Sequence, residues 1–326
     1  MEPRRPCRLR YRGPILLRNF SGDDVHAALD YPSLIDALRE AFRQGGEPMP
    51  VRQAYDVGFA GAPAHLLTMP AWQRGQTLGV KLVTVFPQNA ARGLGAVSSL
   101  YVLFDGETGV PRAMIDGEAL TNRRTAAASA LASSYLSRPD SSTLLMVGTG
   151  HLAHHLPPAH AAVRPIDKVL VWGRNGERAA ALAATLQGKG LAATAVGDLD
   201  VAIAQADIVS CATTSTQALV RGRLLRPGTH VDLVGAFTPQ MRECDDNTML
   251  RAAVYVDTRA GALKEAGDIL QPMAAGLLSA DAIRGDLHDL ASGAVPGRRD
   301  EAEITVFKSV GAAIEDLTAA SLLVRA

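Results

Sequence analysis

Apolar residues in the first third of the chain follow two patterns. Residues 33–44, SLIDALREAFRQ, place apolar side chains at helical spacing behind a serine, which predicts a helix. The runs HLLTMPAW (65–72) and GVKLVTVF (79–86) predict strands, and SSLYVLFDGETGVPRAMID (98–116) predicts a hairpin around a glycine-containing turn. The N-terminal part is therefore expected to be α+β with antiparallel strands.

Beyond this hairpin the pattern becomes an alternation of strands and helices. A long alanine-rich helix is predicted over 119–137 and a second helix over 176–188. Strands are predicted at 142–147, 168–172, 191–196, 207–212, 230–234 and 253–257. Such alternation indicates a parallel, doubly wound sheet. The final stretch, 303–323, predicts one capped amphipathic helix that packs back on the first part.

A glycine loop follows the first strand of this second part. Residues 148–153, GTGHLA, match the pattern GxGxxA between an apolar strand and a helix, the context in which this pattern indicates dinucleotide binding. The first glycine allows a tight turn, the second lets a pyrophosphate approach the backbone, and free amides at the helix start bind phosphates. Pro157 and Pro158 lie beyond that first turn, so we expect a kinked or restarted helix with an intact phosphate site.

The end of the second strand indicates which dinucleotide is bound. The place where many such sites have an acid for the ribose 2′-hydroxyl contains Arg174, whose planar fork suits a 2′-phosphate, and Arg178 follows one turn later. NADP(H) is therefore expected in preference to NAD(H); the alternative for Arg174 is a solvated loop charge. The expected cofactor contacts are Gly148, Thr149, Gly150, His151, Leu152, Arg174, Asn175, Arg178, Thr213, Thr214, Val234, Gly235 and Ser309.

Composition excludes several other classes of function. Apolar residues make up 47% and charged residues 20% of the chain, and the formal net charge is zero, which does not suggest a nucleic-acid partner. Cys7, Cys211 and Cys244 form no CxxC pair, so a reducing compartment is expected. The basic N-terminus lacks the core of a signal peptide and no apolar run reaches membrane-spanning length, so a cytoplasmic protein without membrane contact is predicted.

Other polar residues have two readings each. His151, His154 and His155 have spacings compatible with a metal, but no cysteine or acid completes a ligand set, and no metal is expected. Lys81 in an apolar strand is either an edge residue that reaches water or a buried amine with a lowered pKa. Arg52 and Arg124 are either surface charges or a clamp for a carboxylate.

Several stretches in order along the chain resemble the ornithine cyclodeaminase/μ-crystallin family. They are GVKLVTVFPQNAARGL, LFDGETGVPRAMIDGEALTNRRTAAASALASSYL, VGTGHLAH, VDLVGAFTPQMRECD, EAGDI and TVFKSVGAAIEDLTAA. The resemblance implies an α/β homodimer in which a Rossmann domain, expected at 123–300, is inserted in a substrate and dimerisation domain formed by 1–122 and 301–326. It also implies that Lys81 is the active-site lysine and that Arg52 and Arg124 bind the substrate carboxylate.

Two positions depart from the family pattern and bear on the chemistry. Ala96 stands where the family often has threonine, and Phe237 stands where its cyclodeaminases and alanine dehydrogenases have aspartate. Phenylalanine moves no protons but packs against an apolar ring, whereas cyclisation of ornithine benefits from a carboxylate beside the substrate. We therefore expect an NADPH-dependent reductase of small cyclic 2-imino acids, such as Δ1-pyrroline-2-carboxylate or Δ1-piperideine-2-carboxylate, with proline or pipecolate as product.

Two alternatives remain at this point. The chain could be a true ornithine cyclodeaminase or amino-acid dehydrogenase, against which Phe237 and Arg174 argue. It could also be a non-catalytic NADPH-binding protein like the crystallins of the resembling family, against which Arg52, Lys81 and Arg124 argue. Because the substrate rests on one position and on family analogy, ring size and stereochemistry are left open.

Overall fold

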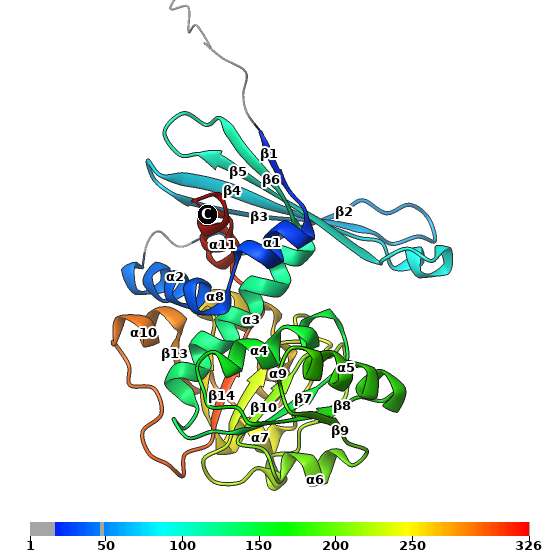
Figure 1. Cartoon of the computed structure of the whole chain (residues 1–326), viewed down its shortest axis with the longest axis vertical. Coiled ribbons are helices and arrows are strands. Elements are labelled where there is room, and N and C mark those ends of the chain that lie inside the picture. Colours follow the sequence, from blue (N-terminus) through cyan, green and yellow to red (C-terminus); the bar gives the residue numbers. More distant parts are fainter. Residues whose placement is uncertain (1–16, 46–48, 326) are drawn as a thin grey trace, which may run out of the picture.

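The computed structural model describes residues 17–45 and 49–325, in which two sheets stand one above the other in Figure 1. The upper sheet has six strands in the order β1-β6-β5-β4-β3-β2. Its strands are antiparallel neighbours except β1 and β6, which are parallel. Their bounds are β1 Arg18–Phe20, β2 Gln53–Asp56, β3 His65–Gln73, β4 Thr77–Val85, β5 Val97–Asp105 and β6 Pro111–Asp116. The predicted strands and the hairpin are confirmed.

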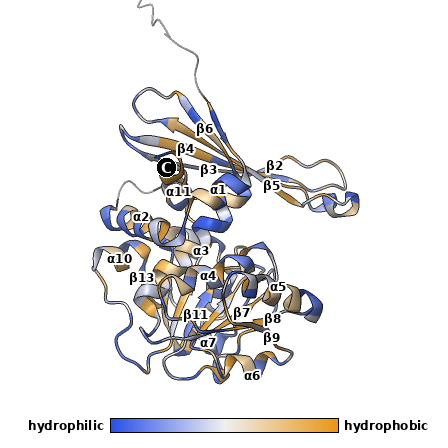
Figure 2. Ribbon diagram, viewed as in Figure 1, coloured by the Kyte–Doolittle hydropathy of each residue, from blue (hydrophilic) through white to orange (hydrophobic). Residues whose placement is uncertain are grey.

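One face of the upper sheet is covered by helices. Side chains alternate along the strands, so that Lys81, Tyr101 and Leu103 are buried while their neighbours Val80, Leu100 and Val102 are exposed or half-buried on the opposite face. The covering helices are α1 (Gly22–Ala28), α3 (Gly117–Leu136) and α11 (Ala313–Arg325), and α2 (Tyr31–Gln44) packs in turn on α3 and α11. Figure 2 shows the hydrophobic colour along strands of this sheet. The expectation that the last helix packs back on the first part is confirmed.

The lower sheet is parallel and has eight strands in the order β13-β12-β14-β11-β10-β7-β8-β9. Five of them reproduce the 3-2-1-4-5 order of a dinucleotide-binding fold, with the switch point between β7 and β10. The strands are β7 Thr143–Val147, β8 Lys168–Trp172, β9 Ala193–Ala195, β10 Ile208–Cys211, β11 His230–Leu233, β12 Ala253–Val256, β13 Ile283–Asp286 and β14 Thr305–Lys308. The predicted α/β doubly wound sheet is confirmed.

Short helices flank this sheet and one long helix links it to the upper part. The flanking helices are α4 Leu156–Ala161, α5 Gly176–Gly188, α6 Leu199–Ile203, α7 Asp246–Arg251, α8 Arg259–Glu265, α9 Gly267–Ala274 and α10 Leu287–Ser292. The 3-10 helices are η1 Pro87–Arg92, η2 His151–His154, η3 Gly222–Leu224 and η4 Ala280–Ala282. Helix α3, Gly117–Leu136, begins at its N-cap Asp116 and contacts β5 above and β14 below. Figure 1 shows α3 between the two sheets.

The prediction of a single helix over 303–323 is wrong. Its first part is β14, which lies between β11 and β12 in the lower sheet, and only 313–325 is helical. A short, fully buried strand has no alternation of apolar and polar residues, so periodicity alone does not separate it from a buried helical turn. The domain limit expected at residue 300 therefore places β14 apart from the sheet to which it is hydrogen-bonded.

The two prolines lie at the start of a new helix. A 3-10 turn covers His151–His154, and α4 begins at Leu156 with Pro157 and Pro158 in its first turn. Amides in a first turn have no acceptor within the helix, so proline costs no hydrogen bond there. The expected restart of the helix is confirmed. Within 17–45 and 49–325, no helix has the length and apolar character needed to cross a bilayer.

Candidate active site

The glycine loop after β7 has the shape that a bound pyrophosphate needs. Gly148 has φ 118°, and a Cβ at this position would lie 2.4 Å from the carbonyl oxygen of Ala212. At Gly150, by contrast, a Cβ would meet no atom within 4 Å, so the backbone there faces open space. A Cβ at Gly173, after β8, would lie 2.7 Å from Thr149 Cγ2. The residues present at this loop, Gly148, Thr149 and Gly150, fit a dinucleotide, and their contact with a cofactor stays a prediction.

The remaining residues of this loop connect it to α3. Leu152 is half-buried against the core, whereas His151 is exposed and its Nδ1 contacts Glu118 Oε1 in the first turn of α3. His155 is held differently, because its Nδ1 lies 3.0 Å from Tyr31 Oη and its ring stacks on His26. Within the described residues, no three His, Cys, Asp or Glu side chains form a group suited to a metal ion.

The predicted ribose-binding residues lie at the start of α5. Arg174, Asn175 and Arg178 are all exposed. Asn175 is the N-cap of α5 and its Oδ1 accepts a 2.9 Å hydrogen bond from the amide of Arg178. The Asn175 side chain therefore has a local structural role, whereas the Arg174 guanidinium makes no hydrogen bond or ion pair in the described parts of the chain.

The loops after β10, β11 and β14 lie side by side because these parallel strands are neighbours. Thr213 is half-buried and Thr214 is exposed after β10, Val234 and Gly235 are buried after β11, and Ser309 is buried after β14. The amide of Ser309 donates to Leu233 O at 3.1 Å, and the amide of Val234 donates to Cys211 O at 2.8 Å. The structure thus brings these predicted cofactor residues to one edge of the sheet.

Lys81 is buried and paired. Its Nζ lies 2.9 Å from Asp316 Oδ1, 2.8 Å from Asp316 Oδ2 and 3.4 Å from Thr121 Oγ1. Burial, together with repulsion from Arg124, lowers the pKa of Lys81 to about 8, although Asp316 opposes this shift. Of the two expectations for Lys81, the buried amine with a lowered pKa holds, and its partner Asp316 comes from α11.

Arg124 lies beside Lys81 and shares its partner. Arg124 Nε donates to Asp316 Oδ1 at 3.0 Å and Nη1 donates to Glu315 Oε2 at 2.6 Å. Although burial opposes ionisation of Asp316, Arg124 and Lys81 hold the pKa of this carboxyl below its usual value. Burial raises the pKa of Glu315 to about 7, against the charge of Arg124. The reading of Arg124 as a surface charge is wrong, since the side chain is buried.

Arg52 completes a cluster of three cations. Its Nε lies 3.2 Å from Glu265 Oε2, and its Nη2 donates to Val310 O at 2.6 Å. Val310 follows Ser309 in the loop from β14 to α11. Next to it, a Cβ at Gly311 would lie 2.7 Å from Arg124 Nη1. The amides of Val310 and Gly311 donate to Asp257 Oδ2 at 2.7 and 2.6 Å, so a buried carboxylate holds the loop where the cation cluster meets the sheet edge.

The two predicted pocket residues are placed differently. Phe237 follows the loop after β11 and is 43% exposed, at the same sheet edge as the cofactor residues. Ala96 lies in the β4–β5 connection, where its carbonyl accepts from the amide of Phe86 at 2.7 Å. Phe86 is five residues beyond Lys81, or about 16 Å along an extended chain at about 3.3 Å per residue. Within one chain, the structure does not bring Ala96 to Lys81.

Sequence reasoning missed the acidic half of the site. Asp316, Glu315 and Glu265 pair with the three cations, and a further buried set, Glu243, Asp268 and Lys308, lies behind the cofactor loops. All except Glu243 and Lys308 fall in the short stretches EAGDI and AIEDL. These acids stand among small apolar residues, and a charge in such surroundings needs a partner once it is buried, but the sequence does not show which of them are buried.

Comparison with known proteins agrees with this geometry. A family model described as ornithine cyclodeaminase/mu-crystallin family matches residues 21–325. A Δ1-pyrroline-2-carboxylate reductase of Paracoccus denitrificans is 42% identical, with 93% of this chain and 94% of the relative covered. The structure of the Thermococcus litoralis Δ1-pyrroline-2-carboxylate reductase in complex with NADH and L-proline has a TM-score of 0.89 at 33% identity, covering 95% of this chain and 97% of that chain.

A more distant solved structure has the same architecture. An archaeal alanine dehydrogenase dimer with bound NAD has a TM-score of 0.87 at 27% identity, and 95% of each chain is covered. The family model spans both sheets, the glycine loop and all three site cations. The chain therefore belongs to the ornithine cyclodeaminase/mu-crystallin family.

Proposed function

We propose that this protein is an NADPH-dependent reductase of small cyclic 2-imino acids, with Δ1-pyrroline-2-carboxylate and Δ1-piperideine-2-carboxylate as substrates. The observation that carries the proposal is the cluster of Arg52, Lys81 and Arg124 at the edge of the sheet where the glycine loop lies. A cyclic imino acid presents one carboxylate and one C=N bond, and the cluster offers arginines for the first and an amine for the second.

The residues divide the chemistry between them. When bound, a nicotinamide cofactor supplies the hydride that reduces the C=N carbon. Arg52 and Arg124 orient the substrate by its carboxylate, and their buried or half-buried positions strengthen that interaction relative to water. Lys81 holds a proton at Nζ and delivers it to the substrate nitrogen, a role favoured by its pKa of about 8. Asp316 keeps Nζ in place through both carboxylate oxygens.

Cofactor preference and assembly are parts of the same proposal. The exposed guanidinium of Arg174, just after β8, has no partner among residues 17–45 and 49–325 and favours NADP(H), while one relative's structure contains NADH. The outward face of the upper sheet exposes Leu78 and Leu100, with Val80 and Val102 half-buried between them, and a second copy of the chain would cover it. We place this homodimer in the cytoplasm, with no nucleic acid or membrane as partner.

The test is a pair of assays on the purified protein. NADPH oxidation is measured with a panel of cyclic 2-imino acids, and ammonia release is measured with ornithine and NAD⁺. Rapid NADPH oxidation with the imino acids and little ammonia are expected. Ammonia release at a rate matching the best imine reduction would contradict the proposal and support a cyclodeaminase, and NAD⁺ reduction with an amino acid alone would support a dehydrogenase.

The cofactor part has its own test. Kd values for NADPH and NADH are measured with the unchanged protein and with Arg174→Asp, where the charge at the end of β8 is reversed. NADPH should bind more tightly than NADH, and Arg174→Asp should weaken NADPH and spare or improve NADH. Tighter binding of NADH by the unchanged protein would refute the preference and leave the imine reductase assignment standing.

A further inference from the structure

Glu243 is a buried carboxylate whose oxygens both accept hydrogen bonds from the cofactor loops. Oε1 accepts from the amide and the Oγ1 of Thr213, at 2.7 and 2.9 Å, in the loop after β10. Oε2 accepts from the amides of Gly235 and Ala236, at 2.7 and 3.2 Å, in the loop after β11. One side chain thus ties together two loops that belong to different strands.

The two loops are also interlocked by shape. A Cβ at Gly235 would lie 2.1 Å from Thr213 O, 2.2 Å from Thr213 N and 2.5 Å from Glu243 Oε1. Glycine is therefore required for the loops to approach this closely. Glu243 lies at this close approach and accepts hydrogen bonds from both loops. The position of one loop relative to the other therefore depends on this residue.

A second layer holds Glu243 itself. Asp268 Oδ1 accepts from the amides of Glu243 and Cys244, at 2.8 and 3.0 Å. Lys308 Nζ, fully buried at the end of β14, lies 3.3 Å from Asp268 Oδ2 and 4.0 Å from Glu243 Oε2, and it donates to Leu233 O at 3.2 Å. Lys308, at the end of β14, therefore faces both buried carboxylates behind the loops that follow β10 and β11.

We propose that Glu243 is a positioning residue that sets the loops after β10 and β11 in the shape that receives the nicotinamide half of the cofactor; the inference rests on the proposed function. The glycine loop after β7 and Arg174 after β8 lie on the pyrophosphate and adenosine side of the switch point. The loops tied by Glu243 lie on its other side, so the adenosine half has no need of them. Phe237 follows Ala236 directly, so the same tie also positions the backbone from which this side chain extends.

The hydrogen bonds require Glu243 to be ionised. Three of its four donors are backbone amides, which cannot accept a proton, so a protonated carboxyl loses at least one acceptor position for them. The charged or titratable groups facing it are Lys308, Asp268 and Cys211. Burial raises the pKa of Glu243 to about 7, Lys308 opposes this rise and Asp268 adds to it. Binding that depends on the nicotinamide half should therefore weaken as the pH falls below about 7.

The experiment compares a whole ligand with half of it. Calorimetry gives Kd values of NADP⁺ and of 2′,5′-ADP, which lacks the nicotinamide half, for the unchanged protein and for Glu243→Gln. The amide of glutamine would face backbone N–H groups as a donor, so NADP⁺ should bind at least tenfold more weakly while 2′,5′-ADP changes less than twofold. Equal weakening of both ligands, or of neither, would overturn the proposal. If the unchanged protein binds neither ligand, the proposed function fails instead.

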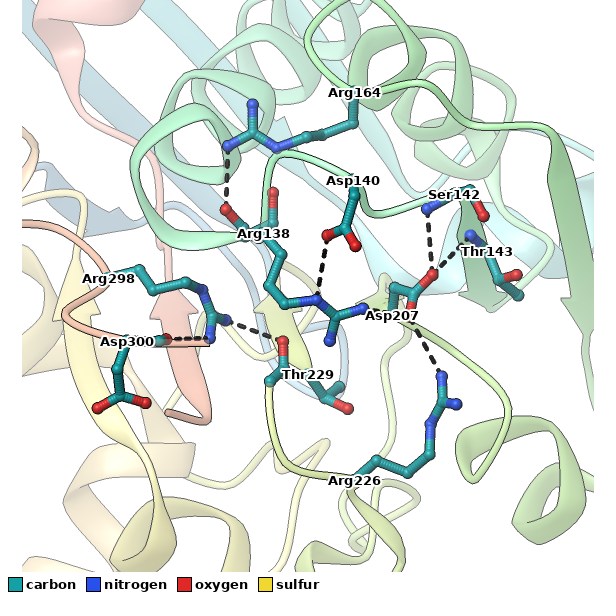
Figure 3. Close-up of polar contacts among 12 residues, drawn as sticks. Arg138, Asp140, Ser142, Thr143, Arg164, Asp207, Arg226, Thr229, Arg298 and Asp300 are labelled. Carbon is teal, nitrogen blue, oxygen red and sulfur yellow. Dashed lines mark hydrogen bonds and ion pairs between the residues drawn. The ribbon is translucent and has the colours of Figure 1, made fainter. Parts of the chain in front are cut away.

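A matched carboxylate at the opposite end of the sheet serves as control. Figure 3 shows Asp207, which accepts from the amides of Ser142 and Thr143, at 3.1 and 3.0 Å, and pairs with Arg138 and Arg226. Asp207 thus also ties chain segments together, but at the amino end of the sheet, away from the cofactor loops. Asp207→Asn should lower Tm and leave the ratio of the two Kd values unchanged.

A second variant keeps the proposal testable if Glu243→Gln does not fold. Asp268→Asn retains the oxygen that accepts from the amides of Glu243 and Cys244, but removes the charge that raises the pKa of Glu243. The loss of NADP⁺ affinity at acid pH, which we call the acid limb, should then begin at a lower pH. Binding of 2′,5′-ADP should show no such loss in either protein. An acid limb that stays in place in Asp268→Asn would overturn the proposal, because a purely structural carboxylate leaves it unmoved.

Discussion

Asp316 contacts two of the three site cations, which makes it the residue on which the proposed proton transfer depends most. It favours the charged form of Lys81, whose pKa is nevertheless lowered to about 8 by burial and by Arg124. In Asp316→Asn this favourable charge is lost, so the Lys81 pKa falls further. We predict that imine reduction declines above about pH 8 in the unchanged protein and at lower pH in Asp316→Asn, measured as kcat against pH.

The neighbouring carboxylate provides the control. Glu315 contacts Arg124, and the structure gives it no hydrogen bond to Lys81. Glu315→Gln should therefore leave unchanged the pH at which kcat begins to decline, even if the variant unfolds more easily. If both variants shift the pH of this decline alike, or if neither shifts it, Lys81 is not the group whose titration causes the decline.

Arg52 is a cleaner probe of carboxylate binding than Arg124. Truncation of Arg124 would leave the buried Glu315 and Asp316 without their partner, and such a loss typically costs about 3–5 kcal/mol of stability. The Arg52 side chain is 17% exposed and pairs with one carboxylate, that of Glu265. Its truncation therefore leaves fewer buried groups without a partner than truncation of Arg124 does. We predict that Arg52→Met raises KM for the imino acid roughly ten- to a hundred-fold, as expected for a charged hydrogen bond of about 1.5–3 kcal/mol.

Two readouts separate this role from a structural one. Steady-state kinetics give KM for the imino acid, and calorimetry gives the cofactor Kd, which should stay within about twofold. Lys81→Met offers the reciprocal pattern, in which kcat falls and substrate binding is largely kept. An Arg52→Met variant with an unchanged KM would remove Arg52 from the substrate site.

At this scale the sequence revealed the cations and not the acids. Lys81 was noticeable as a lysine in an apolar strand, and Arg124 opened a helix of small residues. Their partner Asp316 is 235 residues from Lys81 and stands in an ordinary first helical turn, where acids are common. Nothing local distinguishes an acid that caps a helix from one that pairs with a buried lysine.

The first helix of the dinucleotide-binding unit is divided into η2 and α4. Since Pro157 and Pro158 occupy the first turn of α4, they remove no helical hydrogen bond. Replacing both by alanine should cost about 0.4–1 kcal/mol per residue, mainly because the unfolded chain gains freedom. Urea unfolding measures this loss, and the Kd of NADP⁺ should not change, because the phosphate amides precede residue 156. A tenfold weaker Kd would show that the prolines shape the phosphate loop.

Strand β14 shows why an element can be misread. Thr305–Lys308 is buried on both faces in the middle of the sheet, and Lys308 has no exposed surface. A lysine next to small residues reads as the polar face of a helix, unless its partners Glu243 and Asp268 are known. Those partners come from sequence positions 40 or more residues earlier, so tertiary pairing decides the element. The strands of the hairpin needed no such information, because their alternation and turn are local.

On the scale of the whole molecule, the sequence predicted two parts and their classes but not how they join. Helix α3 runs between the sheets, and Arg164 Nη2 donates to Ser133 O, Ser134 O and Ser137 O at its end. Arg298 Nε donates to Leu136 O at 2.8 Å, also at the end of this helix, and Figure 3 shows the Arg164 side chain directed toward the chain at Arg138. The joint places Arg124, on the same helix, beside the loop from β14 to α11. The position of α3 between the two sheets depends on contacts between residues distant in sequence, and composition and periodicity carry no information about such contacts.

The exposed face of the upper sheet leads to the last prediction. Inward positions of β4 and β5 are buried under α11 and α3, while outward positions such as Val80, Leu100 and Val102 have no cover within the described residues. Burial of this face by a second copy would remove apolar surface from water and protect it from other contacts. We predict that the protein is a dimer in solution and that Val102→Arg yields a monomer of about 34.3 kDa by sedimentation equilibrium.

The control places the same change elsewhere. Val201, on α6 of the lower part, is 52% exposed, so Val201→Arg adds an equal charge without touching the sheet and should leave the dimer intact. A charge buried between two apolar sheets lacks a partner, whereas one on α6 remains in water, and this difference is the reason for the contrast. If Val102→Arg stays dimeric and the dissociation constant of the dimer is unchanged, the interface lies on another surface. Should the unchanged protein sediment as a monomer at every concentration, the homodimer itself is refuted.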